Sequence, residues 1–192
     1  MTGREGFIGG IPENIFRDGF DEFPILGRSG SLLEGSIQKD QVLLQSQEKL
    51  PNTKGTPLYI FKAAIDYDDP HMLSLNIRTK RGNPPVKHPD LYASALVERS
   101  LTYLEEQGSE IRRIKGFWAG GDNYDEYWKH IRKIENMRHA TQVDKKEAAK
   151  NTWTGHMAQT LGFTDVQSVD QKLFGTVKVI FSKPQALILQ NK

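Results

Sequence analysis

Seven polar or aromatic residues in two separate stretches of the sequence carry side chains that a catalytic or binding site needs. An aspartate and a histidine can exchange protons with a substrate, a threonine hydroxyl can hydrogen-bond to it, and an asparagine can orient it. We therefore predict a cleft in which Asp122, Thr154 and His156 are catalytic. The residues predicted to bind the substrate are Trp118, Asn123, Thr152 and Trp153. Whether the cleft catalyses a reaction is not decided by the residue types.

The same residues have an ordinary structural interpretation. Asp122 is suited to cap a helix, the two threonines can hydrogen-bond to the backbone of their own helix, and the tryptophans can belong to the core. His156 would then be a polar surface residue. The functional interpretation requires the turn around Asp122 and the stretch NTWTGHMAQTLGF (151–163) to converge on one pocket.

Gly155 lies in the middle of the second stretch, which has the composition of a helix. A glycine inside a helix costs roughly 1 kcal/mol relative to alanine. That cost is offset where another backbone or a ligand must approach closely. We therefore expect a close approach at this turn.

The elements that position these residues follow from the hydrophobic pattern. Leu73, Leu75 and Ile77 alternate with polar residues, as in a half-buried strand, and the turn DYDDP (66–70) joins this strand to an apolar strand before it. Asp122 and Asp144 are predicted N-caps of two helices. The predicted order is strand 57–65, strand 71–79, a helix from Pro89 that stops at Gly108, strand 111–118, helix 122–136, a helix from Asp144 that ends at Gly162, and two strands within 164–183.

This order predicts an α+β fold, with a mostly antiparallel sheet and helices packed on it. We assign this domain to residues 57–192. Residues 1–56 are rich in Gly, Pro, Ser and Gln and lack sustained periodicity, so we predict a loosely structured N-terminal arm. The segment ALIL (186–189) is expected to form an edge strand or a partner-binding tail.

The composition excludes several classes of site. Without cysteine, the chain has neither disulfides nor thiolate metal ligands, and its 5 histidines do not have metal-ligand spacing, so no metal site is predicted. We also expect no membrane span, since no apolar run approaches the roughly 20 residues that a spanning helix needs. The amino terminus lacks the order of a signal peptide. The expected location is the cytoplasm, or outside the cell after export by a dedicated secretion system.

The segment 129–150 is the most basic part of the chain, with 7 cationic and 3 acidic residues. Such a segment is typical of a surface that binds an acidic protein or a nucleic acid, and equally of a solvated helical face. A non-enzymatic binding module that uses this segment is therefore one of the functions that we consider.

Three segments resemble the carboxy-terminal half of GNAT-type N-acetyltransferases: PDLYASALVERSLTYLEEQGSEIRRIKGFW (89–118), NTWTGHMAQTLGFTDVQSV (151–169) and TVKVIFSK (176–183). The resemblance implies a GNAT-like topology over about residues 57–183 and an acyl-CoA-dependent N-acyltransferase. Acetyl-CoA would bind through its pyrophosphate at the start of the first helix. The chain departs from the family at Leu91, where a glycine is expected, and at Ala158, where a general-acid tyrosine is expected.

A second resemblance concerns toxins. The chain is similar to carboxy-terminal domains of bacterial polymorphic toxins in three places: Trp118, DNYDEYW (122–128) and EAAKNTWTGHMAQTLGF (147–163). It implies a toxin or effector of unresolved reaction, with a cognate immunity protein as partner. The stretch PENIFRDGF (12–20) is similar to the start of toxin-type ADP-ribosyltransferases, which implies a further alternative.

Overall fold

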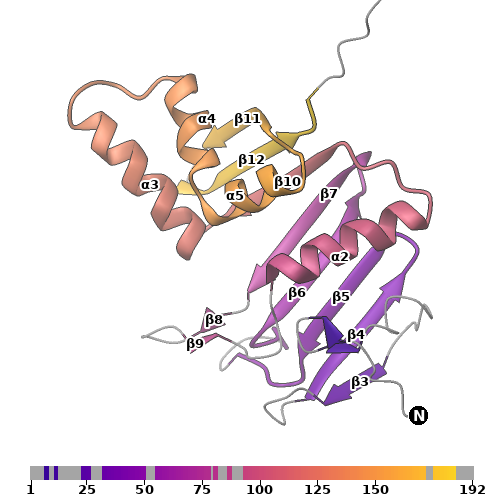
Figure 1. The fold of residues 1–192 in the computed structure, drawn as a ribbon. Coiled ribbons are helices and arrows are strands. Elements are labelled where there is room, and N and C mark those ends of the chain that lie inside the picture. Colours follow the sequence, from indigo (N-terminus) through magenta and orange to yellow (C-terminus); the bar gives the residue numbers. More distant parts are fainter. Residues whose placement is uncertain are drawn as a thin grey trace, which may run out of the picture. The chain divides into compact units, whose positions relative to one another are not determined.

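The computed structural model describes residues 7–8, 11–12, 23–26, 32–50, 55–78, 80–81, 86–87, 93–171 and 175–184. The chain divides into two compact units, Met1–Ile111 (unit 1) and Arg112–Lys192 (unit 2). Strands and helices occur in both units, which confirms the α+β class (Figure 1).

Unit 1 is built on an antiparallel meander, in which each strand pairs with the next one along the chain. One helix, α2, follows the meander and contacts β6. Two short hairpins, β1 with β2 and β8 with β9, complete the described part of this unit. The elements are β1 (Phe7–Ile8), β2 (Ile11–Pro12), β3 (Phe23–Leu26), β4 (Leu32–Gln38), β5 (Gln41–Ser46), β6 (Ile60–Asp66), β7 (Asp69–Arg78), β8 (Lys80–Arg81), β9 (Val86–Lys87) and α2 (Ala93–Glu106).

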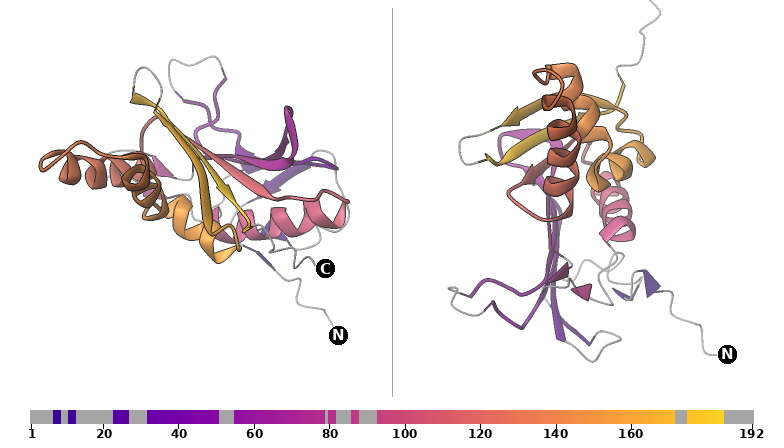
Figure 2. Two further views of the ribbon diagram at one scale, coloured as in Figure 1. Left: turned by 90° about the horizontal axis from the view of Figure 1, so that it is seen from above. Right: turned by 90° about the vertical axis from the view of Figure 1, so that its left-hand side faces the viewer.

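The core of unit 1 follows from alternation in the strands and from one stripe on the helix. Val42, Leu44 and Phe61 are fully buried, and the residues beside them in the chain are only half-buried. Seen edge-on in Figure 2, α2 lies along one side of these strands. It buries Leu96 and Leu104, which are two turns apart on the helix.

The strands predicted at 57–65 and 71–79 are confirmed as β6 and β7. The region predicted as an arm, however, contributes β4 and β5, and β5 pairs with β6. Leu43 and Leu44 are adjacent apolar residues, which obscures the period of two in β5. The segments 13–20, 88–92 and 186–189 lie outside the described residues, so the interpretations placed there stay predictions.

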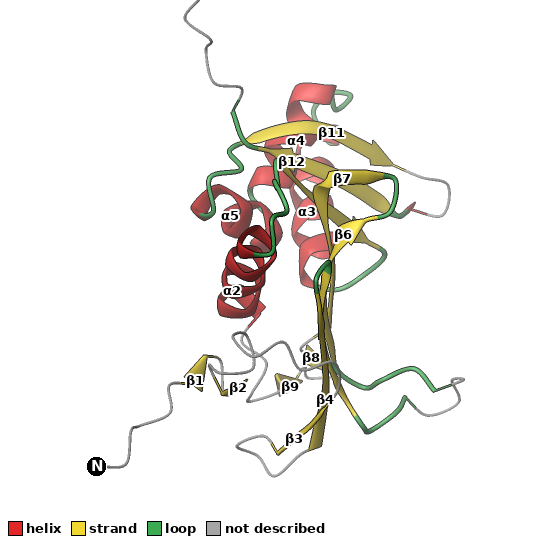
Figure 3. Cartoon of the chain, turned by 90° about the vertical axis from the view of Figure 1, so that its right-hand side faces the viewer, coloured by secondary structure: helices red, strands yellow, loops and turns green. Residues whose placement is uncertain are grey.

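The described part of unit 2, residues 112–171 and 175–184, has three antiparallel strands and three helices. The last strand, β12, lies between β10 and β11 and pairs with both. Figure 3 shows the helices grouped beside β11 and β12. The buried side chains of the strands include Ile114, Val179 and Phe181. The elements are β10 (Arg113–Trp118), α3 (Asp122–Glu135), α4 (Gln142–Lys150), α5 (Trp153–Thr160), β11 (Asp165–Gln171) and β12 (Val177–Ser182).

Three predictions about the helices of unit 2 were wrong in detail. The helix predicted from Asp144 is two helices, because Thr152 has an extended backbone (φ −89°, ψ 164°) and caps α5. Asp144 is the third residue of α4, and Thr141 is its N-cap. Asp122 is the first helical residue of α3, since Gly121 holds the cap position with φ 80°. A carboxylate in the first turn still complements the helix dipole.

In the described part of the chain, none of the helices combines the length and the apolar character that crossing a membrane requires.

Candidate functional site

The start of α5 is held by side chains rather than by solvent. The amide of Trp153 donates to Glu126 Oε2 (2.8 Å), and the amide of Thr154 donates to Asn123 Oδ1 (2.8 Å). The amide of Gly155 donates to Thr152 Oγ1 (3.1 Å). The first amides of a helix have no hydrogen-bond acceptor within the helix. These three bonds give the first amides of α5 the acceptors that water or a ligand would otherwise supply.

The structure therefore brings together four of the predicted binding and catalytic residues, Asn123, Thr152, Trp153 and Thr154. It brings them together as a junction between α3 and α5, which we call the α3–α5 junction. The Asn123 oxygen and the Thr152 hydroxyl are engaged with backbone amides. Glu126 was not among the predicted site residues, although it lies one turn after Asn123 on the same face of α3.

Gly155 is the site of close approach that the sequence predicts, and the approaching group is backbone. A Cβ atom at this position would lie 2.3 Å from the Ala149 carbonyl oxygen and 2.4 Å from that of Lys150. The end of α4 is fixed there, since Thr152 Oγ1 donates to the Ala149 carbonyl (2.8 Å) and Gln159 Nε2 donates to the Lys150 carbonyl (3.0 Å). Only glycine allows α4 and α5 to pack this closely.

Asp122 and His156, the predicted acid–base pair, are both exposed. The His156 ring makes no hydrogen bond or ion pair with any described residue, so the pair is not assembled by direct contact. Thr154 is 5% exposed. The assignment of these three residues as catalytic stays a prediction.

Trp118 lies in the core of unit 2, where 5% of it is exposed. Its ring centroid is 6.0 Å from that of Tyr127, which is fully buried. Gln171 Nε2 donates to the Tyr127 hydroxyl oxygen (2.9 Å). Burial raises the pKa of Tyr127 to about 12, so this phenol stays protonated at neutral pH. Trp118 and Tyr127 thus hold α3 against the strands.

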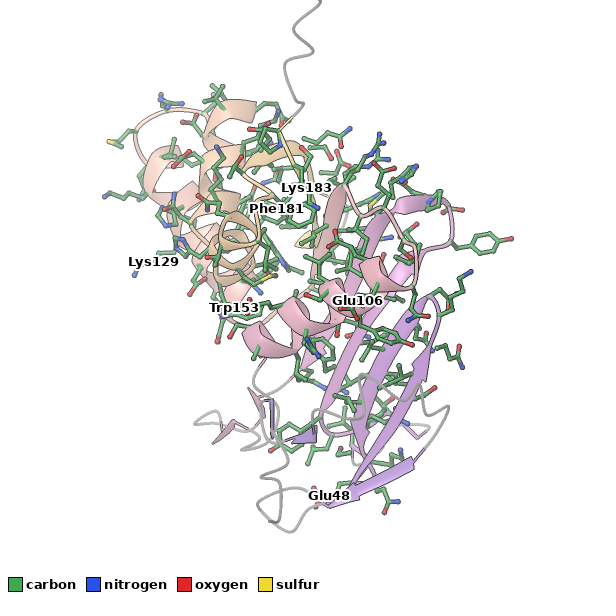
Figure 4. All side chains as sticks on the ribbon, turned by 45° about the vertical axis from the view of Figure 1, so that its right-hand side comes forward. Glu48, Glu106, Lys129, Trp153, Phe181 and Lys183 are labelled. Atoms are coloured by element: carbon green, nitrogen blue, oxygen red, sulfur yellow. The ribbon has the colours of Figure 1, made fainter. Side chains whose placement is uncertain are left out.

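A depression of about 410 Å³ lies on α3. Its lining comes from a single helix face and combines three cations with an indole ring and two further polar groups. Figure 4 shows the Lys129 side chain pointing away from the helices and strands of unit 2. The lining residues are Asp125, Trp128, Lys129, Arg132, Lys133 and Asn136. The depression overlaps the basic segment 129–150 that the sequence analysis singled out.

The start of α4 is stabilised by a charged pair within the same basic segment. Both oxygens of Asp144 accept hydrogen bonds from Arg138 (2.6 and 2.7 Å), and one also accepts from the Thr141 amide (2.8 Å). The Arg138 guanidinium, followed by Thr141, holds the pKa of the Asp144 carboxyl well below its usual range. Arg138 is thereby occupied within the fold.

Asp144→Asn is expected to lower the melting temperature at pH 7 and to lower it less in acid. A carboxyl whose pKa is depressed in the folded state contributes stability above its unfolded pKa of about 3.9, and loses it as the pH falls further. The difference in melting temperature between the wild type and the variant should therefore narrow below about pH 4. Thermal unfolding at pH 7, 4 and 2.5 checks this, and an unchanged difference at the lowest pH would contradict it.

Comparison with models of known protein families finds no match, and comparison with curated proteins finds no significant match. The function of the chain has to be inferred from its own residues and their geometry.

Proposed function

We propose that the chain is a GNAT-type module that binds an acyl-CoA thioester. The observation that supports this most directly is the connectivity within each unit. In unit 1, β7 leads through the short strands β8 and β9 to the long helix α2. In unit 2, β10 leads through helices to α5 and then to the β11–β12 hairpin. The helix α5 ends at Thr160, and its C-cap Leu161 comes just before Gly162 and Phe163. The resemblance in the sequence implies the same succession of elements.

Ala158 bears on how far the chemistry of the family extends to this chain. It stands where the resemblance expects a general-acid tyrosine, and it is fully buried, without a proton donor. The described residues therefore do not fit the complete acyl-transfer chemistry, and we derive no proton-transfer step. The proposal is for binding of the thioester, with N-acyl transfer as the reaction class that the bound ligand suggests.

Acetyl-CoA is expected to stabilise the protein against heat. A ligand at a hundredfold its dissociation constant adds about 2.7 kcal/mol to the apparent stability. Thermal unfolding with acetyl-CoA up to millimolar concentration, with acetyl phosphate and ATP as controls, measures the effect. No shift with acetyl-CoA, or an equal shift with ATP, would rule out specific thioester binding.

A second candidate is the toxin or effector function, for which the reaction is unresolved. The hydrogen bond from the Thr154 amide to Asn123 supports it, because the two stretches that resemble toxin domains meet there. Asp122 and His156 remain exposed and accessible to a substrate. In this proposal the chain acts in a bacterial cytoplasm, either in the cell that receives it after export or in the cell that produces it. An immunity protein inhibits it.

Induced expression of the wild-type chain in a bacterium without an immunity protein is expected to arrest growth. The variants Asp122→Ala, Thr154→Ala and His156→Ala should each relieve the arrest if these residues act on the substrate. Circular dichroism of each purified variant shows whether relief comes from unfolding. Toxicity that survives in all three folded variants would exclude this set of residues.

A further inference from the structure

We infer that the outer face of α3 binds single-stranded nucleic acid, with one nucleotide seated in the depression between Asp125 and Asn136. Two faces of α3 have separate roles. Tyr127 and Ile131 are fully buried against the unit. The lining residues of the depression recur at helical spacing on a different face of α3. Among them, Trp128 also touches the core, through its ring contact with Tyr127.

The depression carries an excess of positive charge. Lys129, Arg132 and Lys133 face one carboxylate, Asp125, which leaves a charge of +2 in the lining. None of the three cations forms an ion pair with a described residue, in contrast to Arg138, which is bound to Asp144. Cations in the last turn complement the helix dipole. Lys129 lies one turn earlier, so the dipole does not account for the whole group.

The indole of Trp128 distinguishes this surface from an ordinary basic helix. Tyr124 and Tyr127 lie edge-on to its ring, with centroid distances of 6.1 and 5.5 Å, and hold it in place. Its Nε1 atom is buried and has no hydrogen-bond partner. Proteins that bind single strands combine aromatic rings, on which bases stack, with cations that follow the phosphates. An acidic peptide would use the cations alone.

The dimensions also suit a single strand. The lined stretch of α3 spans roughly 16 Å at 1.5 Å per residue, and is long enough for several phosphates in succession. The volume of about 410 Å³ is in the range of sites that hold a small ligand, which is the size class of one nucleotide. In a duplex the bases are stacked inside and would not reach the ring. This inference is independent of acyl-CoA binding.

The test is fluorescence anisotropy of a labelled 12-residue oligo(dT) with the full chain, at salt concentrations from 50 to 200 mM. Lys129→Gln/Arg132→Gln/Lys133→Gln is expected to weaken binding at least tenfold. The slope of the logarithm of its binding constant against the logarithm of the salt concentration should be smaller in magnitude by about 2, since each phosphate contact contributes roughly 0.7 for a single strand. Trp128→Phe should weaken binding without changing the salt slope, because it alters stacking and leaves the charges in place.

The matched control is Lys39→Gln/Lys49→Gln/Lys62→Gln, which removes the same charge from positions in unit 1. It should change the affinity less than threefold. Equal losses in the two triple variants, or no binding by the wild type at 50 mM salt, would overturn the inference. Equally tight binding of poly-glutamate would also overturn it, since any polyanion would then suffice. Tight binding of dTMP alone would show that the site holds a free nucleotide instead.

Discussion

Gly155→Ala is expected to destabilise the protein by about 3 kcal/mol, although the same change stabilises an ordinary helix. In an unconstrained helix alanine gains roughly 1 kcal/mol over glycine. Here the new methyl group would meet two carbonyl oxygens of α4 at 2.3 and 2.4 Å. Backbone atoms cannot move aside as a flexible side chain can, so the overpacking cost exceeds the gain in helix propensity. Urea denaturation of the two proteins measures the difference.

Gly120→Ala is the matched control for this change. Nothing lies within 4 Å of a Cβ atom placed at Gly120. We expect its stability to stay within about 0.5 kcal/mol of the wild type, as for most surface substitutions. If Gly155→Ala were as stable as this control, the close packing of α4 against α5 would be wrong.

Tyr127→Ala is expected to cost about 3–5 kcal/mol, as the truncation of a large buried aromatic side chain does. Tyr127 is fully buried, and its ring contacts those of Trp118 and Trp128. The loss of the ring removes the contact that holds α3 against the strands. Chemical denaturation, monitored through tryptophan fluorescence, measures this loss of stability, since Trp118 and Trp128 lie next to Tyr127.

Tyr127→Phe separates the ring from the hydroxyl. It removes only the hydrogen bond from Gln171, so we expect a loss of about 1 kcal/mol. Because the pKa of Tyr127 is raised to about 12, the wild type should lose stability between about pH 10, where the unfolded phenol ionises, and pH 12. The phenylalanine variant should lack this part of the alkaline decline. Equal effects of the alanine and phenylalanine changes would contradict the anchoring role of the ring.

The sequence predicted those parts of the fold in which the local pattern and the tertiary structure agree. The alternation of Leu73, Leu75 and Ile77 predicted β7, and the helix predicted at 122–136 is α3. β5 was not predicted as a strand, because adjacent leucines hide its alternation. The strand is the third of five in the meander, and its pairing with β6 is a tertiary contact that its own local pattern does not reveal.

The candidate site was predicted in part, for a similar reason. The position of Gly155 in a helix predicted a close approach, but the approaching group could not be named without the fold. A new helix can begin after Thr152 because two side chains of α3, Asn123 and Glu126, accept hydrogen bonds from the first amides of α5. Residues so far apart in the chain leave no local signal of their pairing. The sequence therefore identified the residues of the α3–α5 junction as candidates for a site. It could not distinguish a structural role of these residues from a chemical one.

The α3–α5 junction also affects how unit 2 opens. The first turn of a helix normally frays first, because its amides have only solvent as a partner. In α5 the amides of Trp153 and Thr154 are held by α3, so this turn cannot unravel unless it separates from its neighbour. The two helices should consequently behave as one cooperative element, whose amide protons exchange with solvent together rather than from the end inward.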